Sequence, residues 1–160
     1  FVGRALDSDR KSLTAVLQRA AEHRGSALVE VFQDCPIVND GSFDVLRKGD
    51  TDNRLIPVVH GEPIVFGAEG SHAVVQDGFK LKVVETASVA VHGGADDELA
   101  VALCRLSDQD LTHAVTGSFR NTDRTTYDDA ARAQVQAARD AEPDADLQAL
   151  LNGRDTWTIV

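Results

Sequence analysis

The sequence predicts an α/β fold, and three observations carry this prediction. Residues 8–24 have the pattern of an amphipathic helix, and after Gly25 a β-branched, aromatic stretch over residues 26–33 predicts a strand. Several short strand-like runs follow between residues 55 and 85, and the C-terminal part returns to helical patterns. A short apolar strand directly after an amphipathic helix is typical of a mostly parallel sheet covered by helices.

The composition is that of one folded, acidic domain. The chain has 160 residues, of which 42% are hydrophobic, so it can bury a core. Sixteen Lys and Arg against 26 Asp and Glu give a net charge of −10, which argues against nucleic acid or anionic lipid as partners. Apolar runs are far shorter than the roughly 18 residues of a membrane span, and no signal-peptide pattern is visible. The two cysteines form no C-x-x-C pair, so we expect no disulfide framework and a cytoplasmic protein with no membrane partner.

The helix over residues 8–24 has one apolar face, made by Leu13, Val16, Leu17, Ala20 and Ala21. We expect Asp7 or Ser8 to cap its first amides and Gly25 to supply a left-handed residue at its C-terminal end. The apolar pattern of residues 1–4 predicts the end of a strand. Because the sequence opens in this apolar stretch and contains no methionine, we expect a fragment whose N-terminal part is missing.

The middle of the chain predicts a small antiparallel meander. Its strands are expected at residues 55–59, 64–66, 73–75 and 79–85. Residues 67–70 and the dipeptide Asp77-Gly78 break the runs, and Asp-Gly is typical of hairpin turns. We expect the meander to pack on the α/β body, because an isolated ribbon of two or three strands is only marginally stable.

Helical patterns dominate the C-terminal part: one helix is expected to run to Leu106, and others are expected at about residues 126–141 and at 147–151. Asp96 or Asp97 is expected to cap the first, Pro143 to stop the second and Gly153 to close the third. The second helix has little on its apolar face beyond alanine and Val135, so we expect it to bury little apolar surface and to lie as an arm on a neighbour.

The common signatures of self-contained catalysis are absent. No phosphate-binding, zinc-binding or serine-nucleophile motif occurs. The five histidines are scattered, with no pair at helical i, i+4 spacing, so we expect surface or turn roles for them. Asp128 and Asp129 open a predicted helix, where the helix dipole explains them.

Cys35 stands in a loop directly after the predicted strand and precedes Pro36. Ligands of α/β sheets bind at the carboxyl ends of strands, and a Cys-Pro dipeptide follows the last ligand of bacterial-type ferredoxin cluster motifs. From the residues alone, a buried inert thiol and a metal or cluster ligand both stay open. Cys104 lies in an apolar helical pattern and is expected to be a core or helix-surface residue.

Several segments resemble the β subunit of 2-oxoacid:ferredoxin oxidoreductases. They are residues 1–4, the stretch from Ala27 to Ile37, and Asn39 to Gly41. The stretch from His60 to Gly67 and the ending from Asp155 to Thr158 resemble the actinobacterial 2-oxoglutarate type. The match covers most of the chain.

This resemblance implies that the chain is the C-terminal part of such a subunit. Residues 1–50 would end a thiamine-diphosphate-binding α/β domain that carries the Cys-Pro loop, and residues 51–160 would form the β meander and a helical extension. Cys35 is the one site residue that transfers, as a ligand of a 4Fe-4S cluster; no catalytic residue is carried over. The other cluster cysteines and the residues that hold thiamine diphosphate and Mg belong to the N-terminal half in that family. Val38 departs from the family, which often has an aromatic residue there.

The implied reaction is the oxidative decarboxylation of 2-oxoglutarate to succinyl-CoA and CO2 with reduction of ferredoxin. The implied partners are the α subunit, ferredoxin, coenzyme A and the 2-oxoacid, and the fragment alone is expected to be inactive. Asp34, beside Cys35, is expected to lower the cluster potential if it is close and unpaired. Pyruvate or another 2-oxoacid stays open as substrate, and so does a non-catalytic α/β interaction module in which Cys35 is an ordinary buried thiol.

Overall fold

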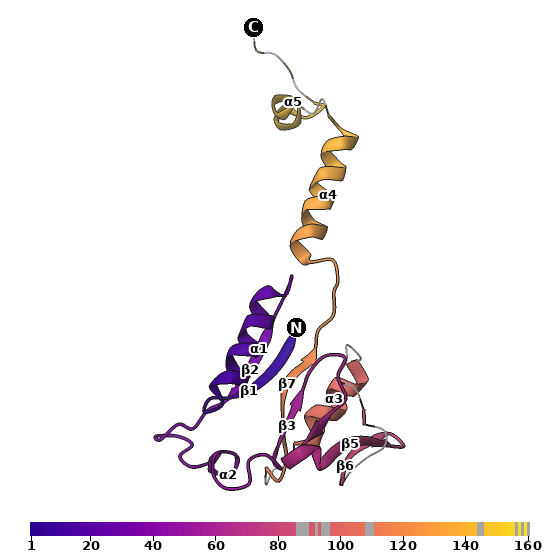
Figure 1. Ribbon diagram of the computed structural model, residues 1–160. Coiled ribbons are helices and arrows are strands. Elements are labelled where there is room, and N and C mark those ends of the chain that lie inside the picture. The colour runs from indigo at the N-terminus through magenta and orange to yellow at the C-terminus, as the bar shows by residue number, and fades with distance from the viewer. Residues whose placement is uncertain are drawn as a thin grey trace. The chain divides into compact units, whose positions relative to one another are not determined.

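The computed structural model divides into two units, residues 1–123 and 124–160 (Figure 1). The residues that it describes are 1–85, 90–91, 93, 97–107, 111–143, 146–155, 157 and 159. The first unit holds both sheets, and the second holds two helices. This mixture of sheets and helices agrees with the predicted α/β class.

A four-stranded sheet lies at the centre of the first unit, in the order β2-β1-β7-β3. Its strands are β1 (Val2–Leu6), β2 (Leu28–Phe32), β3 (Leu55–Val58) and β7 (Ala114–Arg120). The β1–β2 and β3–β7 pairs are parallel, whereas β1 and β7 are antiparallel. Two of the three strand pairs are thus parallel, as expected, and the sheet is mixed because β7, which the sequence patterns did not predict, pairs antiparallel with β1.

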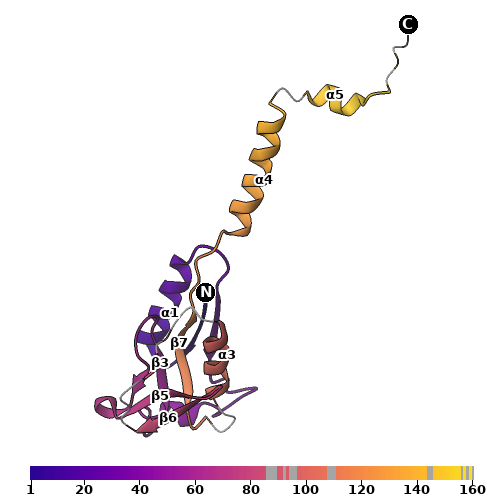
Figure 2. The same cartoon turned by 90° about the vertical axis from the view of Figure 1, so that its right-hand side faces the viewer.

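Helices α1 (Arg10–Glu22) and α3 (Asp97–Leu106) cover opposite faces of this sheet, as Figure 2 shows. Val16 of α1 packs with Phe1 and Ala5, whereas Val2 packs against the cluster that contains Leu103 of α3. Neighbouring strand residues point to opposite faces, so β1 contributes to both clusters. The helix predicted over residues 8–24 is thus confirmed, with ends two residues shorter on each side.

The cap of α1 differs from the prediction. The Asp9 side chain accepts a hydrogen bond from the Ser12 amide at 3.1 Å, so the cap is neither Asp7 nor Ser8. The carboxylate of Asp7 is instead held by Arg47. Gly25 has a positive φ of 119°, but it lies two residues beyond the C-cap of the helix.

A three-stranded antiparallel meander is confirmed in β4 (Val65–Phe66), β5 (His72–Asp77) and β6 (Lys80–Glu85). A 3-10 turn, η1 (Ala68–Gly70), precedes β5. Asp77 pairs with Lys80, so Gly78 and Phe79 form a two-residue hairpin turn, and Gly78 has the required positive φ of 62°. As expected, the meander packs on the α/β body: Phe66 and Val74 share the cluster that contains Val115 and Leu103.

The first expected strand of the meander lies elsewhere. Residues 55–58 form β3, which pairs with β7 in the central sheet. Ile56 and Val58 are both buried there, in one cluster with Val115 and Phe119 of β7. The central sheet thus takes strands from both sides of the boundary expected between residues 50 and 51.

The stretch 34–53, expected as a loop, contains one short helix, α2 (Asp44–Arg47). Leu46 of α2 is buried against Leu6 and Ala114. This contact anchors α2 beneath the carboxyl end of β1. The anchored helix places Arg47 beside the loop that carries Cys35.

The second unit consists of α4 (Tyr127–Ala141) and α5 (Leu147–Asn152). The Thr126 hydroxyl caps α4 by accepting from the Asp129 amide at 3.1 Å, and Gly153 ends α5 as predicted. Neither helix has a buried residue, and Val135 is 52% exposed, in agreement with the weak burial expected for α4. Asp96, a predicted cap of α3, lies outside the described residues, as do His92, Thr156 and Thr158. None of the described helices is long and apolar enough to span a membrane.

Candidate functional site

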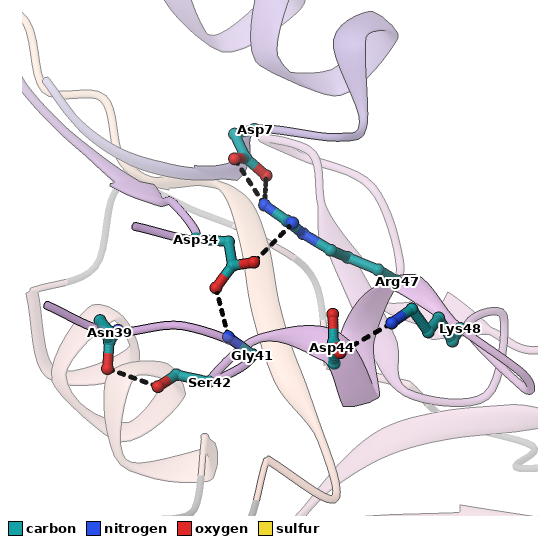
Figure 3. Close-up of polar contacts among 8 residues, drawn as sticks. All are labelled: Asp7, Asp34, Asn39, Gly41, Ser42, Asp44, Arg47 and Lys48. Carbon is teal, nitrogen blue, oxygen red and sulfur yellow. Dashed lines mark hydrogen bonds and ion pairs between the residues drawn. The ribbon is translucent and has the colours of Figure 1, made fainter. Parts of the chain in front are cut away.

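The parallel strands β1 and β2 end at the same edge of the sheet, and an aspartate follows each of them. Asp7 comes directly after β1, and Asp34 lies two residues beyond β2. Arg47, from α2, reaches both carboxylates (Figure 3). The Nη2 atom of its guanidinium lies 2.5 and 2.6 Å from the two oxygens of Asp7, and Nη1 lies 3.3 Å from Asp34 Oδ2. These three side chains form a charged cluster at the carboxyl edge, the site where α/β sheets place ligands.

The loop that begins at Asp34 is closed on itself by two hydrogen bonds. Asp34 Oδ1 accepts from the Gly41 amide at 2.8 Å, and the carbonyl oxygen of Cys35 accepts from the Asn39 amide at 2.9 Å. Gly41 has a positive φ of 75°, which lets the chain turn back towards Asp34. The loop from Asp34 to Gly41 therefore has a defined shape around Cys35.

The thiol of Cys35 is half-buried within this loop. Hydrogen bonds from the backbone amides of Ile37, Val38 and Asn39 lower its pKa, and they outweigh burial and the charge of Asp34, which raise it. The amides thus favour the thiolate, which is the form that binds metals. A thiolate at a strand end that accepts amide hydrogen bonds has the chemistry of a cluster ligand.

Asp34 differs from the prediction in one respect. Its expected effect on a cluster potential required an unpaired carboxylate, whereas it contacts the Arg47 guanidinium and the Gly41 amide. Two carboxylates share one guanidinium, so the cluster of Asp7, Asp34 and Arg47 carries one net negative charge. Asp34 therefore serves first to close the loop, and Arg47 offsets much of its charge.

Cys104 lies on α3 and is exposed. The buried residues of α3 are Ala100 and Leu103, so of the two positions expected for Cys104, core or helix surface, the structure shows the helix surface. In a helix, neighbouring residues point in different directions, and Leu103 takes the inward position. The structure thus places the two cysteines in different settings, one in a closed loop and the other on a helix surface.

The comparison with known proteins finds one similar protein of named function. Over an alignment of 168 residues, the chain is 61% identical to the 2-oxoglutarate oxidoreductase subunit KorB of Mycobacterium tuberculosis. The chain is similar to KorB. The alignment covers 99% of this chain but 45% of KorB, so the chain spans less than half the length of this relative. The resemblance to a 2-oxoglutarate oxidoreductase subunit, stated from sequence motifs, is thereby confirmed. No family model and no solved structure matches the chain.

The described residues of this chain could supply one ligand of a 4Fe-4S cluster, but not all four. A 4Fe-4S cluster takes four cysteine thiolates, and here Cys35 alone lies in a loop suited to a ligand. Within the described residues, His, Cys, Asp and Glu form no group of three or more that could hold a metal ion. Cys35 therefore fits as one ligand, and the described carboxylates do not fit a magnesium diphosphate site by themselves.

Sequence reasoning found Cys35 and Asp34 but missed Asp7 and Arg47. Asp7 could have been found, because an acidic residue directly after the first strand must lie beside the end of a parallel neighbour. Arg47 gave no such signal, since it lies 40 positions from Asp7 in a stretch that reads as a loop.

Proposed function

We propose that this chain is part of the β subunit of an enzyme that oxidatively decarboxylates 2-oxoglutarate to succinyl-CoA and CO2 and reduces ferredoxin. The observation that carries the proposal is the 61% identity to a 2-oxoglutarate oxidoreductase subunit over 99% of the chain. The partners would be an α subunit, ferredoxin, coenzyme A and the 2-oxoacid. The enzyme would act in the cytoplasm.

Within that enzyme, Cys35 is proposed as one thiolate ligand of a 4Fe-4S cluster. Its loop lies at the carboxyl edge of β2, and the backbone amides of Ile37, Val38 and Asn39 stabilise its thiolate. When bound, such a cluster supplies one-electron transfer. The loop of this chain holds the sulfur in place, and Pro36 stiffens the backbone next to it.

Thiamine diphosphate and Mg are proposed cofactors of the same enzyme, held mainly by residues outside this chain. Residues 1–50 would form the end of the domain that binds them. The charged cluster at the carboxyl edge is consistent with this proposal, because the Asp7 and Asp34 carboxylates already pair with Arg47 and so do not form a Mg site by themselves. The 160-residue chain alone is therefore expected neither to bind thiamine diphosphate nor to turn over 2-oxoglutarate.

The test compares Cys35→Ser with Cys104→Ser in the complete α/β enzyme. Iron content, the EPR signal of the reduced cluster and ferredoxin reduction with 2-oxoglutarate are measured for both. Serine at position 35 should lose or distort the cluster and abolish most electron transfer, whereas serine at the exposed position 104 should leave both unchanged.

Full cluster occupancy with an unaltered EPR signal in Cys35→Ser would overturn the ligand assignment and favour an interaction module with an ordinary thiol. Faster ferredoxin reduction with pyruvate than with 2-oxoglutarate would overturn the substrate and keep the enzyme class.

A further inference from the structure

Arg47 joins the ends of two strands to the loop that carries Cys35. Its guanidinium contacts Asp7 after β1 and Asp34 after β2, and Asp34 in turn holds the amide of Gly41. The chain from Asp34 to Gly41 is thus tied at its start to the sheet and at its end to Asp34 (Figure 3). Cys35 lies between these two ties.

The cluster of Asp7, Asp34 and Arg47 is more buried than an ordinary surface ion pair. The Arg47, Asp7 and Asp34 side chains are 22%, 29% and 16% exposed. The next residue, Lys48, pairs with Asp44 at 2.7 Å, but these side chains are 73% and 42% exposed. Solvent screens an exposed pair strongly, so the Lys48 pair should contribute little while the Arg47 contacts keep their strength.

Fold stability alone explains this arrangement poorly. Partly buried ion pairs often gain little over apolar side chains, because the charges must give up water. Arg47 also has a buried Nε atom without a hydrogen-bond partner among the described residues, which adds to that cost. A guanidinium is, however, suited to hold two carboxylates in a fixed geometry, because its donors form a planar fork.

We propose that Arg47 is a positioning residue for Cys35: it clamps Asp34 to Asp7, and the clamp keeps the loop from Asp34 to Gly41 in the shape that presents the sulfur to the iron-sulfur cluster. The proposal rests on the proposed function, in which Cys35 is a cluster ligand. It has an electrostatic consequence as well. The positive charge of Arg47 offsets the carboxylates of Asp7 and Asp34 beside the cluster, so its removal makes reduction of the cluster harder.

The test uses the complete α/β enzyme and three variants: Arg47→Gln, Arg47→Lys and the matched control Lys48→Gln. The two glutamine variants remove one positive charge at neighbouring positions, but only the first opens the clamp. Three quantities are measured: the rate at which a chelator removes iron, the EPR line shape of the reduced cluster, and its midpoint potential. Supporting partners of metal ligands typically contribute about 10–100-fold to retention, so iron loss from Arg47→Gln should be about tenfold faster or more.

Arg47→Gln should also shift the midpoint potential to more negative values and change the EPR line shape, while Lys48→Gln matches the wild type. Arg47→Lys restores the charge without the fork, so its potential should return towards the wild-type value while iron loss stays faster than in the wild type. Equal iron loss and equal potentials in Arg47→Gln and Lys48→Gln would overturn the proposal.

Asp34→Asn keeps the proposal testable if Arg47→Gln does not assemble. Asparagine retains an oxygen for the Gly41 amide, but its amide nitrogen replaces the oxygen that accepts from Arg47, so the clamp opens and one negative charge is lost. Iron loss should therefore be faster than in Lys48→Gln, and the midpoint potential should shift to more positive values. An unchanged potential in Asp34→Asn would count against the electrostatic role of the clamp. The Cys35→Ser variant separates a failure of the proposed function from a failure of the role of Arg47. If Cys35→Ser keeps its cluster, Cys35 is not the ligand and the proposed function of this loop is overturned. If Cys35→Ser loses the cluster while Arg47→Gln resembles Lys48→Gln, only the role of Arg47 is overturned.

Discussion

Gly117 of β7 lies so close to Val58 of β3 that a Cβ atom at position 117 would overlap the Val58 carbonyl oxygen. The two residues are ladder partners in the parallel β3–β7 pair. Gly117 also has a positive φ of 102°, a backbone conformation that side chains disfavour. This approach joins β3 to β7 in the central sheet, and it requires glycine at position 117.

Gly117→Ala should therefore destabilise the protein by about 3 kcal/mol, because the steric overlap adds to the backbone strain. Gly61→Ala is the matched control: Gly61 also has a positive φ, 80°, but a Cβ there meets nothing within 4 Å. It should cost about 1 kcal/mol from strain alone. Urea unfolding of both variants measures the difference, and equal losses of stability would contradict the close approach.

Val16→Ala tests the packing of α1 on the sheet. Val16 is 4% exposed and packs with Phe1 and Ala5, so removing two methyl groups should lower the free energy of unfolding by about 2 kcal/mol. Val135→Ala removes the same groups from α4, where the side chain is 52% exposed. Its effect should stay within about 0.5 kcal/mol. A larger effect at Val135 than at Val16 in thermal unfolding would show that the core is misplaced.

Asp9→Ala should destabilise α1 by about 1 kcal/mol, because the Ser12 amide loses its acceptor. Ser8→Ala, at the neighbouring exposed position, should leave the unfolding midpoint in urea nearly unchanged. A larger loss of stability in Ser8→Ala than in Asp9→Ala would show that Ser8 caps the helix, as the sequence had predicted, and would contradict the Asp9 cap. Both variants leave Asp7 free to pair with Arg47.

The Cys35 thiol should ionise below the ordinary pKa of a free cysteine, about 8.5. The amides of Ile37, Val38 and Asn39 stabilise the thiolate and lower its pKa, so the rate of alkylation should rise to its plateau at a lower pH than for an unperturbed thiol. The rate is followed by mass spectrometry from pH 6 to 10 in cluster-free Cys104→Ser protein, where Cys35 is the one remaining thiol. A midpoint above 8.5 would show that burial and Asp34 dominate instead.

Local patterns predicted the elements that depend on neighbours in sequence. The helix α4 and the hairpin turn at Gly78 follow from side-chain periodicity and turn chemistry, which act over a few residues. The position of Cys35 after a strand also followed from local order. In contrast, β7 escaped prediction because it is buried on both faces and carries Gly117 at its middle, so it shows no alternation of apolar and polar residues.

The sequence by itself determined α1, α3, α4 and α5, the hairpin, the net charge of −10 and the placement of Cys35 in a loop beyond β2. Only the tertiary structure decided that β3 joins β7 and that Arg47 holds Asp7 and Asp34 together. The physical reason is range. Periodicity and capping act between residues a few positions apart, whereas Arg47 and Asp7 are separated by 40 positions and meet only because β1, β2 and α2 pack at one edge of the sheet.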